Sequence, residues 1–303
     1  MTSLTLMTWN VRYFGHGLGG LRATEGWMRL AARAIAQLDP LPDVVALQEV
    51  ETASLRGGLG PRPQIQRFLD HLDAALDDHG LDTRFMGLHF PAHRYALPRV
   101  PPLYTTGLAV LVRDTVEVVA HNADDPHDIT HVRLARFARF KQRRIAAHVR
   151  LRARGGDEEV DLFNTHLSLP AFLEVGPTRV PRKMGHGTNQ LKEAFRVLEF
   201  LELKRGEHAV VLGDFNSAPD SPVYNAFTDR GLIDAHRQGG DENPDEHASA
   251  RFLNQRMHID HVFSTPSVHW QDFHAHRIDE NGPFWGLSDH APKVGRLEVS
   301  SGS

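Results

Sequence analysis

Short apolar runs alternate with amphipathic segments along most of the chain, and this order is typical of an α/β protein. We expect strands at residues 4–9, 43–47, 108–112, 145–151, 160–164, 209–212, 259–263 and 293–299. Gly155 and Gly156 lie between two of these runs and predict a turn that joins them.

Three further segments carry apolar residues at helical spacing. In the first of them Met28, Ala31, Ala32 and Ile35 fall on one stripe. We therefore expect helices at residues 27–38, 65–78 and 189–203.

The predicted strands and helices recur up to both ends of the chain, and no long linker rich in Pro, Gly or Ser divides them. We expect a single α/β domain over residues 1–299, followed by a disordered tail at residues 300–303. Residues 85–106, 169–188 and 238–255 are expected to be long loops. Such loops in a compact domain are usually functional or disordered.

Composition narrows the possible partners. The 303 residues contain 34 Lys and Arg against 38 Asp and Glu, so the net charge is −4. A global attraction to nucleic acid or to anionic membranes is not expected, and a grip on a polyanion must come from a local patch or a metal ion. The chain has no cysteine, which excludes a thiolate nucleophile and a Cys-ligated zinc site and suits a reducing compartment.

The N-terminal residues do not have the pattern of a signal peptide, and no apolar run reaches the roughly 18 residues of a membrane-spanning helix. We therefore expect a cytoplasmic protein without a transmembrane segment. The sequence carries no prediction of oligomeric state.

Polar residues recur where the predicted strands end, and strand ends of α/β sheets are where ligand crevices form. Asp214 and Asn216 lie two positions apart, so their side chains point to the same side of an extended chain. The complete set is Asn10, Glu49, His166, Asp214, Asn216, Asp260, Asp289 and His290.

Carboxylate and amide oxygens predominate in this set, and they are the ligands that suit Mg²⁺ or Mn²⁺. No cysteine spacing indicates a zinc site. A carboxylate–metal centre beside histidines can bind a phosphodiester, activate water and stabilise the negative charge that develops.

The tri- and tetrapeptides around these residues resemble, in order, the motifs of the endonuclease/exonuclease/phosphatase (DNase I-like) superfamily. This group includes pancreatic-type deoxyribonucleases, exonuclease III-like abasic-site endonucleases, inositol-phosphate phosphatases, bacterial sphingomyelinases and deadenylases. The resemblance implies a four-layered α/β sandwich, in which two packed mixed β-sheets are flanked by helices. The motifs are Thr8-Trp9-Asn10, Leu47-Gln48-Glu49, Asn164-Thr165-His166, Gly213-Asp214-Phe215-Asn216, Ile259-Asp260-His261 and Ser288-Asp289-His290.

The resemblance also implies a role for each motif residue. Glu49 would bind the metal, with Asn10 and Asp289 close to it. His290 would act as the general base, oriented by Asp260, because a carboxylate fixes the tautomer of the imidazole and stabilises its charged form.

The remaining implied roles concern water and phosphate. Asp214 and Asn216 would position the attacking water and the phosphate, and His166 would bind the scissile phosphate or assist the leaving oxygen. In deoxyribonuclease-like members a Tyr-x-Glu segment supports this histidine, but here Tyr104 is followed by two threonines, the second of them Thr106. Tyr104 remains a candidate for phosphate contact, whereas the supporting carboxylate is absent.

Two basic segments are candidates for substrate binding. The first runs from Arg133 to Arg144 and contains Phe137 and Phe140, so it is either a solvated face or a patch that binds phosphates and stacks bases. The second follows the His166 motif. The candidate substrate-binding residues are Arg143, Arg144, Arg179, Arg182 and Lys183.

The leading hypothesis is an Mg²⁺- or Mn²⁺-dependent phosphodiester hydrolase, with a nuclease that acts on DNA or RNA as its best single form. The alternative is a small-molecule or phospholipid-headgroup phosphoesterase, such as an inositol-phosphate phosphatase or a sphingomyelinase-like enzyme. The net charge and a possible lid at residues 85–106 favour that alternative. A non-catalytic binding protein built on the same fold is the third hypothesis.

Overall fold

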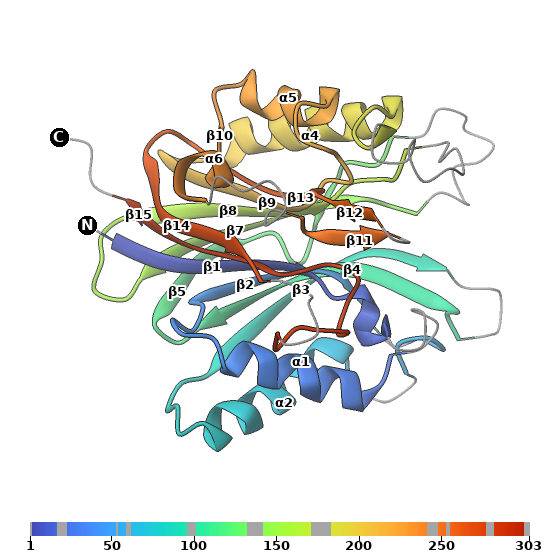
Figure 1. The fold of residues 1–303 in the computed structure, drawn as a ribbon, viewed down its shortest axis with the longest axis vertical. Coiled ribbons are helices and arrows are strands. Elements are labelled where there is room, and N and C mark those ends of the chain that lie inside the picture. Colours follow the sequence, from blue (N-terminus) through green and yellow to red (C-terminus); the bar gives the residue numbers. More distant parts are fainter. Residues whose placement is uncertain are drawn as a thin grey trace.

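Two β-sheets pack face to face, and helices cover the outer face of each (Figure 1). The structure is a computed structural model. It describes residues 2–16, 23–52, 54–58, 62–95, 101–131, 142–170, 183–240, 248–252, 255–276 and 282–299.

The first sheet contains both chain ends of the described structure, with the strand order β14-β15-β1-β2-β4-β3. Strands β1 and β2 are parallel and the other neighbours are antiparallel. Helices α1 (Glu25–Ala36) and α2 (Gln64–Asp78) cover its outer face (Figure 1). The strands are β1 (Thr2–Asn10), β2 (Val44–Val50), β3 (Phe85–Tyr95), β4 (Tyr104–Arg113), β14 (Val268–Ala275) and β15 (Lys293–Val299).

The second sheet has the order β10-β13-β9-β8-β7-β5, with β6 also paired to β7. Strands β8 and β9 are parallel, so this sheet is mixed as well. Its strands are β5 (Val116–His121), β6 (His127–Asp128), β7 (Ile145–Ala153), β8 (Glu159–His166), β9 (His208–Asp214), β10 (Ile233–Asp234) and β13 (Asp260–Ser264).

Helix α4 (Thr188–Lys204) and the short helices α5 (Pro222–Thr228) and α6 (Ala235–Gly239) lie on the side of the second sheet. A 3₁₀ turn, η1 (Arg12–Phe14), follows β1, and β11 (Ala250–Phe252) and β12 (Gln255–Met257) form a separate two-stranded hairpin. Within the described ranges, no helix has the length and apolar character that a bilayer crossing requires.

Alternation along the strands builds the layers. In β1, Leu4 and Leu6 belong to the apolar layer between the sheets, whereas Met7 and Trp9 belong to the layer beneath α1 and α2. A third apolar layer lies between the second sheet and α4. The four-layered sandwich of two mixed sheets and flanking helices is therefore confirmed.

A buried amide pair joins the two sheets beneath the strand ends. Gln48 Nε2 donates to Asn164 Oδ1 at 2.9 Å and to Thr8 Oγ1 at 3.0 Å. Asn164 Nδ2 donates to the carbonyl oxygens of Leu47 and Ala109 at 3.1 and 3.2 Å. Because buried polar groups need partners, these side chains fix how the sheets meet under the polar residues that follow.

All of the strands and helices predicted from the sequence are present, with ends that differ by a few residues. The prediction of a loop over residues 85–106 is wrong, because β3 occupies its first half and β4 begins at Tyr104. The edge strand β3 was missed since its burial is irregular and Pro91 lies next to a register shift, where a strand tolerates proline. The predicted loop 238–255 contains β11, and β5, β14 and α5 were also missed. Most of the predicted loop 169–188, and the tail at 300–303, lie outside the described residues.

Gly213 on β9 lies against the backbone of β8 just before the site. It pairs with Thr165 and has φ = 136°, and a Cβ atom there would lie 2.0 Å from the carbonyl oxygen of Thr165. We expect Gly213→Ala to lower the free energy of unfolding by at least about 2 kcal/mol, through backbone strain and the clash. Urea unfolding measures this change.

The matched control is Gly26→Ala. Gly26 lies in α1, where a Cβ atom meets only Thr24 Oγ1 at 3.8 Å, so this change should leave stability equal or raise it by about 0.5–1 kcal/mol. Equal unfolding free energies for Gly213→Ala and the unmodified protein would contradict the prediction.

Candidate active site

The ends of β1, β2, β8 and β9 and the segment before β15 converge on one cavity of about 290 Å³. Of the predicted site residues, Asp260 does not line this cavity and instead lies behind His290. The lining residues are Asn10, Arg12, Glu49, Gln142, Arg144, His166, Leu169, Met184, Asp214, Asn216, Ala250, Arg251, Met257, Ile259, Asp289 and His290.

Two of the polar residues reach the cavity through unusual backbone conformations. Glu49 has φ = 58° and lies at a register shift of β2 against β4, so that a bulge redirects its side chain. Asn216 has φ = 48°, and its side chain donates to the carbonyl oxygen of Leu167 at 2.9 Å. Left-handed backbone in non-glycine residues is uncommon, and it gathers at functional sites.

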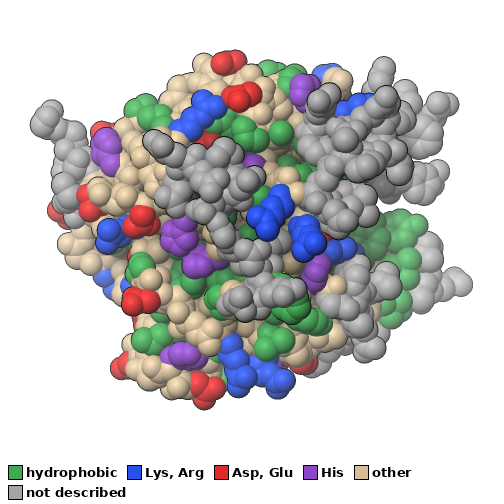
Figure 2. Space-filling model, viewed as in Figure 1, with side chains coloured by type: hydrophobic (Ala, Val, Ile, Leu, Met, Phe, Trp, Pro, Cys, Tyr) green, Lys and Arg blue, Asp and Glu red, His purple; other side chains and the backbone are tan. Residues whose placement is uncertain are grey.

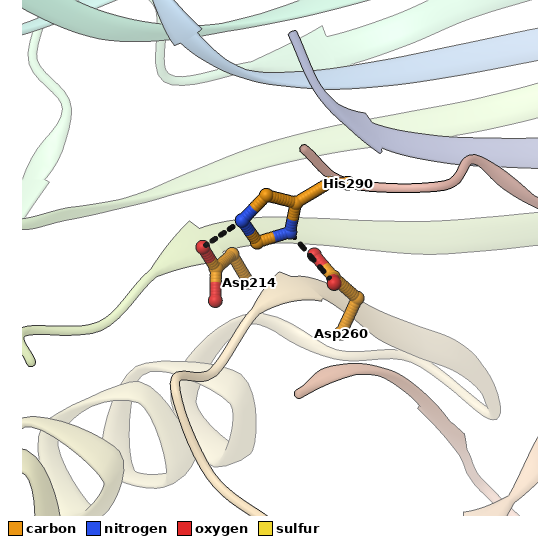
Figure 3. A group of neighbouring side chains, drawn as sticks. All are labelled: Asp214, Asp260 and His290. Carbon is orange, nitrogen blue, oxygen red and sulfur yellow. Dashed lines mark hydrogen bonds and ion pairs between the residues drawn. The ribbon is translucent and has the colours of Figure 1, made fainter. Parts of the chain in front are cut away.

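His290 and Asp260 form a hydrogen-bonded pair that faces Asp214 (Figure 3). His290 Nδ1 lies 2.9 Å from Asp260 Oδ2, and His290 Nε2 lies 3.8 Å from Asp214 Oδ2. Trp9 Nε1 donates to the carbonyl oxygen of His290 at 2.9 Å and so anchors its backbone. Burial lowers the pKa of His290, but Asp260 and Asp214 raise it by more, to about 10.

Asp214 contacts several other polar residues of the site. Its Oδ2 accepts a hydrogen bond from Asn10 Nδ2 at 3.0 Å and lies 3.4 Å from His166 Nε2, and its Oδ1 accepts from the Asn216 backbone N–H at 2.9 Å. Burial, assisted by the charge of Asp260, raises the pKa of Asp214 to about 7. Burial also holds the pKa of His166 well below its usual range, so His166 is neutral.

The predicted metal ligand Glu49 is the second carboxylate that Asn10 contacts. Burial raises the pKa of Glu49, and the charge of Asp289 adds to this effect. Asn10 hydrogen-bonds Glu49 as well as Asp214, while its Oδ1 accepts the Arg12 backbone N–H at 3.0 Å. Asn10 is thus oriented as a donor toward both carboxylates.

These donors fit a hard divalent cation. The carboxylate oxygens of Glu49 and Asp289 line the same cavity, and a buried carboxylate whose charged form is disfavoured gains from a nearby cation. The ligand atoms of Asp214, Asp260 and His290 also lie within 4.8 Å of one another. In that group, however, the facing atoms of His290 and Asp260 are already hydrogen-bonded to each other, which leaves Glu49 and Asp289 as the candidate cation ligands.

Three arginines also line the cavity, and the sequence had pointed only to Arg144. Arg144 Nε is buried and has no hydrogen-bond partner among the residues that the structure describes. Arg12 Nη1 lies 2.7 Å from Asp289 Oδ2, and the Arg251 backbone N–H donates to the carbonyl oxygen of Asp289 at 2.8 Å. Lys and Arg side chains gather near the middle of the face in Figure 2, at the level where Figure 1 places β11 and β12.

Several predicted substrate-binding residues lie elsewhere. Tyr104 does not line the cavity, because it is the first residue of β4, lies beyond the residues that pair with β2 and pairs with Tyr95, on which its ring stacks at 5.4 Å. Arg143 points outward and donates to Asp128 Oδ2 at 2.7 Å. Lys183 is next to a lining residue but is not one itself. Arg179, Arg182 and the basic stretch from Arg133 to Lys141 lie outside the described residues.

One wall of the cavity is apolar. It is built from Met184, Ala250, Met257 and Ile259, which pack together as a small cluster, and from the exposed side chain of Leu169. The β11–β12 hairpin contributes to this wall and is tied to the site, since Ala250 forms a bridge with His290. No sequence pattern predicted this wall, because β11 lies within the predicted loop 238–255 and β12 is only three residues long.

A His–Asp pair that faces carboxylates and amides at the strand ends of a two-sheet sandwich is an arrangement suited to the hydrolysis of phosphoesters. The chain belongs to the endonuclease/exonuclease/phosphatase family, whose model matches residues 7–290.

Solved structures share the fold at low sequence identity, and a comparison with curated protein sequences finds no match. An endonuclease/exonuclease/phosphatase from Bacteroides vulgatus is 20% identical over 99% of this chain and 100% of that chain, with a TM-score of 0.63. The human Nocturnin catalytic domain with bound sulfate is 19% identical over 98% and 94%, with a TM-score of 0.63. A mannosyl-6-phosphatase from Bacteroides thetaiotaomicron is 19% identical over 98% and 100%, with a TM-score of 0.61.

Proposed function

We propose that this protein is an Mg²⁺- or Mn²⁺-dependent phosphodiester hydrolase that acts on nucleic acid. The observation that carries the proposal is the arrangement of His290, Asp260 and Asp214 beside the carboxylates of Glu49 and Asp289 at one cavity. This arrangement supplies a base, an orienting carboxylate and cation ligands within the reach of one phosphate.

In the proposed reaction, water attacks phosphorus in line with the leaving oxygen. His290 Nε2 takes one proton from the water as the new P–O bond forms, and Asp260 stabilises the imidazolium. The ester P–O bond then breaks, and the leaving oxygen receives its proton from solvent. Neutral His166 donates a hydrogen bond to the phosphate, and Asp214 orients the water.

A bound Mg²⁺ or Mn²⁺ would neutralise charge on the phosphate and would offset the carboxylate charge that holds a proton on His290. Glu49 and Asp289 are the ligands that we propose for it. Asn10, whose amide donates to Glu49 and Asp214, would orient the two carboxylates rather than coordinate the ion.

Arg144 is proposed to bind the phosphate, because its side chain lines the cavity with a buried, unpartnered Nε within the described structure. We expect Arg144→Ala to lower kcat/KM by roughly 10- to 100-fold, the value of one or two hydrogen bonds to a charged group. Steady-state kinetics measures this effect.

The neighbouring residue supplies the matched control for this prediction. Arg143 is exposed and paired with Asp128, and an exposed ion pair contributes about 0–1 kcal/mol, so Arg143→Ala should change kcat/KM by less than about fivefold. Equal losses of kcat/KM in the two variants would exclude Arg144 as a phosphate-binding residue.

A small-molecule phosphoesterase is the second candidate. The cavity of about 290 Å³, with one apolar wall, is near the size of a site for a compact ligand, and one neighbour in fold is a mannosyl-6-phosphatase. A binding protein without activity is the third candidate, and the complete arrangement of base, orienting residue and cation ligands disfavours it.

A metal-dependent activity screen tests the proposal. Purified protein with Mg²⁺ or Mn²⁺ is offered single-stranded, duplex, nicked and abasic DNA, RNA, nucleotides, sugar phosphates, inositol phosphates and sphingomyelin, each with an EDTA control. We expect cleavage of at least one nucleic acid form. Turnover of sugar phosphates or headgroups alone would establish the second candidate, and no turnover of any substrate would establish the third.

A further inference from the structure

A second cavity of about 320 Å³ adjoins the first on the far side of Asp289. The two cavities share Arg12, Arg251 and Asp289, so a substrate whose phosphate lies in the first can extend into the second. The residues that line the second cavity are Arg12, His16, Arg251, Trp285, Gly286, Ser288 and Asp289.

Trp285 is the one large apolar side chain among these lining residues, and it is 51% exposed. The turn that carries it is anchored from below. Phe284 is fully buried against Trp9, with ring centroids 5.2 Å apart, and the Leu287 N–H donates to the Phe284 carbonyl oxygen at 3.2 Å. An exposed aromatic side chain on an anchored turn can bind a flat ligand at a lower entropic cost than one on a mobile segment.

The surroundings of Trp285 are cationic. Arg251 is an exposed residue whose backbone is fixed by the hydrogen bond to Asp289, and Arg12 lies between Asp289 and His16, with its Nη1 3.1 Å from His16 Nδ1. An aromatic face beside guanidinium groups is the arrangement that proteins use to hold a base by stacking and the adjoining phosphate by charge.

We propose that the second cavity is a subsite for the nucleotide next to the scissile phosphate, with its base stacked on Trp285 and its outer phosphate bound by Arg251. This inference rests on the proposed function and narrows the substrate to a nucleotide-containing phosphodiester whose base is unpaired. A lipid surface is the competing occupant of an exposed tryptophan. It is disfavoured, because membrane-inserting surfaces use several apolar side chains and the other described lining residues here are polar, charged or glycine.

Tryptophan fluorescence tests the stacking without requiring turnover. The chain has four tryptophans, and Trp9 and Trp270 are buried. Titration with single-stranded octathymidylate, in EDTA and again with Ca²⁺, should quench the emission saturably. The quench should be absent in Trp285→Phe, while binding measured by the anisotropy of a fluorescein-labelled oligonucleotide stays within a few-fold of the unmodified protein.

Affinity measures how much the stacking contributes. Trp285→Ala should weaken octathymidylate binding by roughly 10- to 100-fold, which is the range for one stacked base. Phe195→Ala, which removes a 41% exposed aromatic side chain from α4, is the matched control and should leave the affinity unchanged. Arg251→Ala should reduce the slope of log affinity against log salt by about 0.7, as expected for the loss of one phosphate contact to a single strand.

The outcomes separate this inference from the proposed function. Unchanged oligonucleotide affinity in Trp285→Ala, or no binding at all by the unmodified protein, overturns the subsite even if the enzyme cleaves phosphodiesters. If Trp285→Ala loses binding to phosphatidylserine-containing vesicles but keeps its oligonucleotide binding, Trp285 belongs to a lipid-binding surface instead. In the kinetic arm, Trp285→Ala should raise KM for nucleotide substrates and leave the hydrolysis of a sugar phosphate or an alkyl phosphodiester unaffected.

Discussion

Replacing His290 with alanine is expected to lower kcat by roughly 10²- to 10⁴-fold, which is the usual contribution of a positioned general base. The structure supports so large an effect because His290 Nε2 faces the cavity beside Asp214, while Nδ1 is held by Asp260 at 2.9 Å. Single-turnover kinetics on the substrate identified by the screen measures the chemical step directly.

Asp260→Asn supplies the second half of this prediction. Residues that act as a unit have non-additive effects. The variant that combines His290→Ala with Asp260→Asn should therefore have a kcat close to that of the slower single variant. His274→Ala, at an exposed histidine outside the cavity, is the control and should retain full activity. Because removing one partner of a buried pair also affects stability, His290→Gln is measured alongside with its melting temperature. A well-folded His290→Gln variant with near-normal kcat would exclude His290 as the base.

The apolar runs predicted the fold because the central strands of both sheets are buried on their two faces. Runs such as residues 43–47 and 209–212 therefore predicted core strands, and the polar residue that follows each run was expected at a strand end. The convergence of Asn10, Glu49 and Asp214 therefore followed from the pattern together with the family resemblance. Their contacts did not follow, because these depend on how the two sheets meet.

The features that escaped prediction are set by tertiary structure. The direction of the Glu49 side chain comes from a bulge that no local pattern marks. Strand β3 alternates weakly because it is an edge strand, and the β11–β12 hairpin is too short to show a period. Arg251 enters the site only because this hairpin is tied to the His290 segment. Tyr104 misses the site because it lies beyond the residues of β4 that pair with β2 and pairs with Tyr95 instead.

The excess of carboxylates links metal binding to acid–base chemistry in the site. Burial and the charge of Asp260 raise the pKa of Asp214, and burial and the charge of Asp289 raise the pKa of Glu49. The charges of Asp260, Asp214 and Asp289 raise the pKa of His290 against the effect of burial. Each of these shifts has the sign that added positive charge would oppose. The Glu49 side chain is therefore the position at which charge, metal affinity and stability can be tested together.

Glu49→Gln is expected to abolish the stabilisation by Mn²⁺ and to lower activity by at least about 100-fold, through loss of a carboxylate ligand. A ligand at 100 times its Kd stabilises a protein by about 2.7 kcal/mol, so the unmodified protein should melt at a higher temperature in Mn²⁺ than in EDTA. In the variant the two melting temperatures should coincide. Differential scanning calorimetry at pH 7 measures both.

The same substitution should not destabilise the metal-free protein. Because burial raises the pKa of Glu49, its charged form is disfavoured in the folded state, and a neutral amide of equal size removes that penalty. In EDTA the variant should therefore melt at or above the temperature of the unmodified protein, whereas a structural role for Glu49 would lower it. Glu117→Gln, at an exposed position on β5, controls for the loss of one negative charge and should keep the response to Mn²⁺. A full Mn²⁺ response in Glu49→Gln would place the cation at other ligands, with the group of Asp214, Asp260 and His290 as the next candidate.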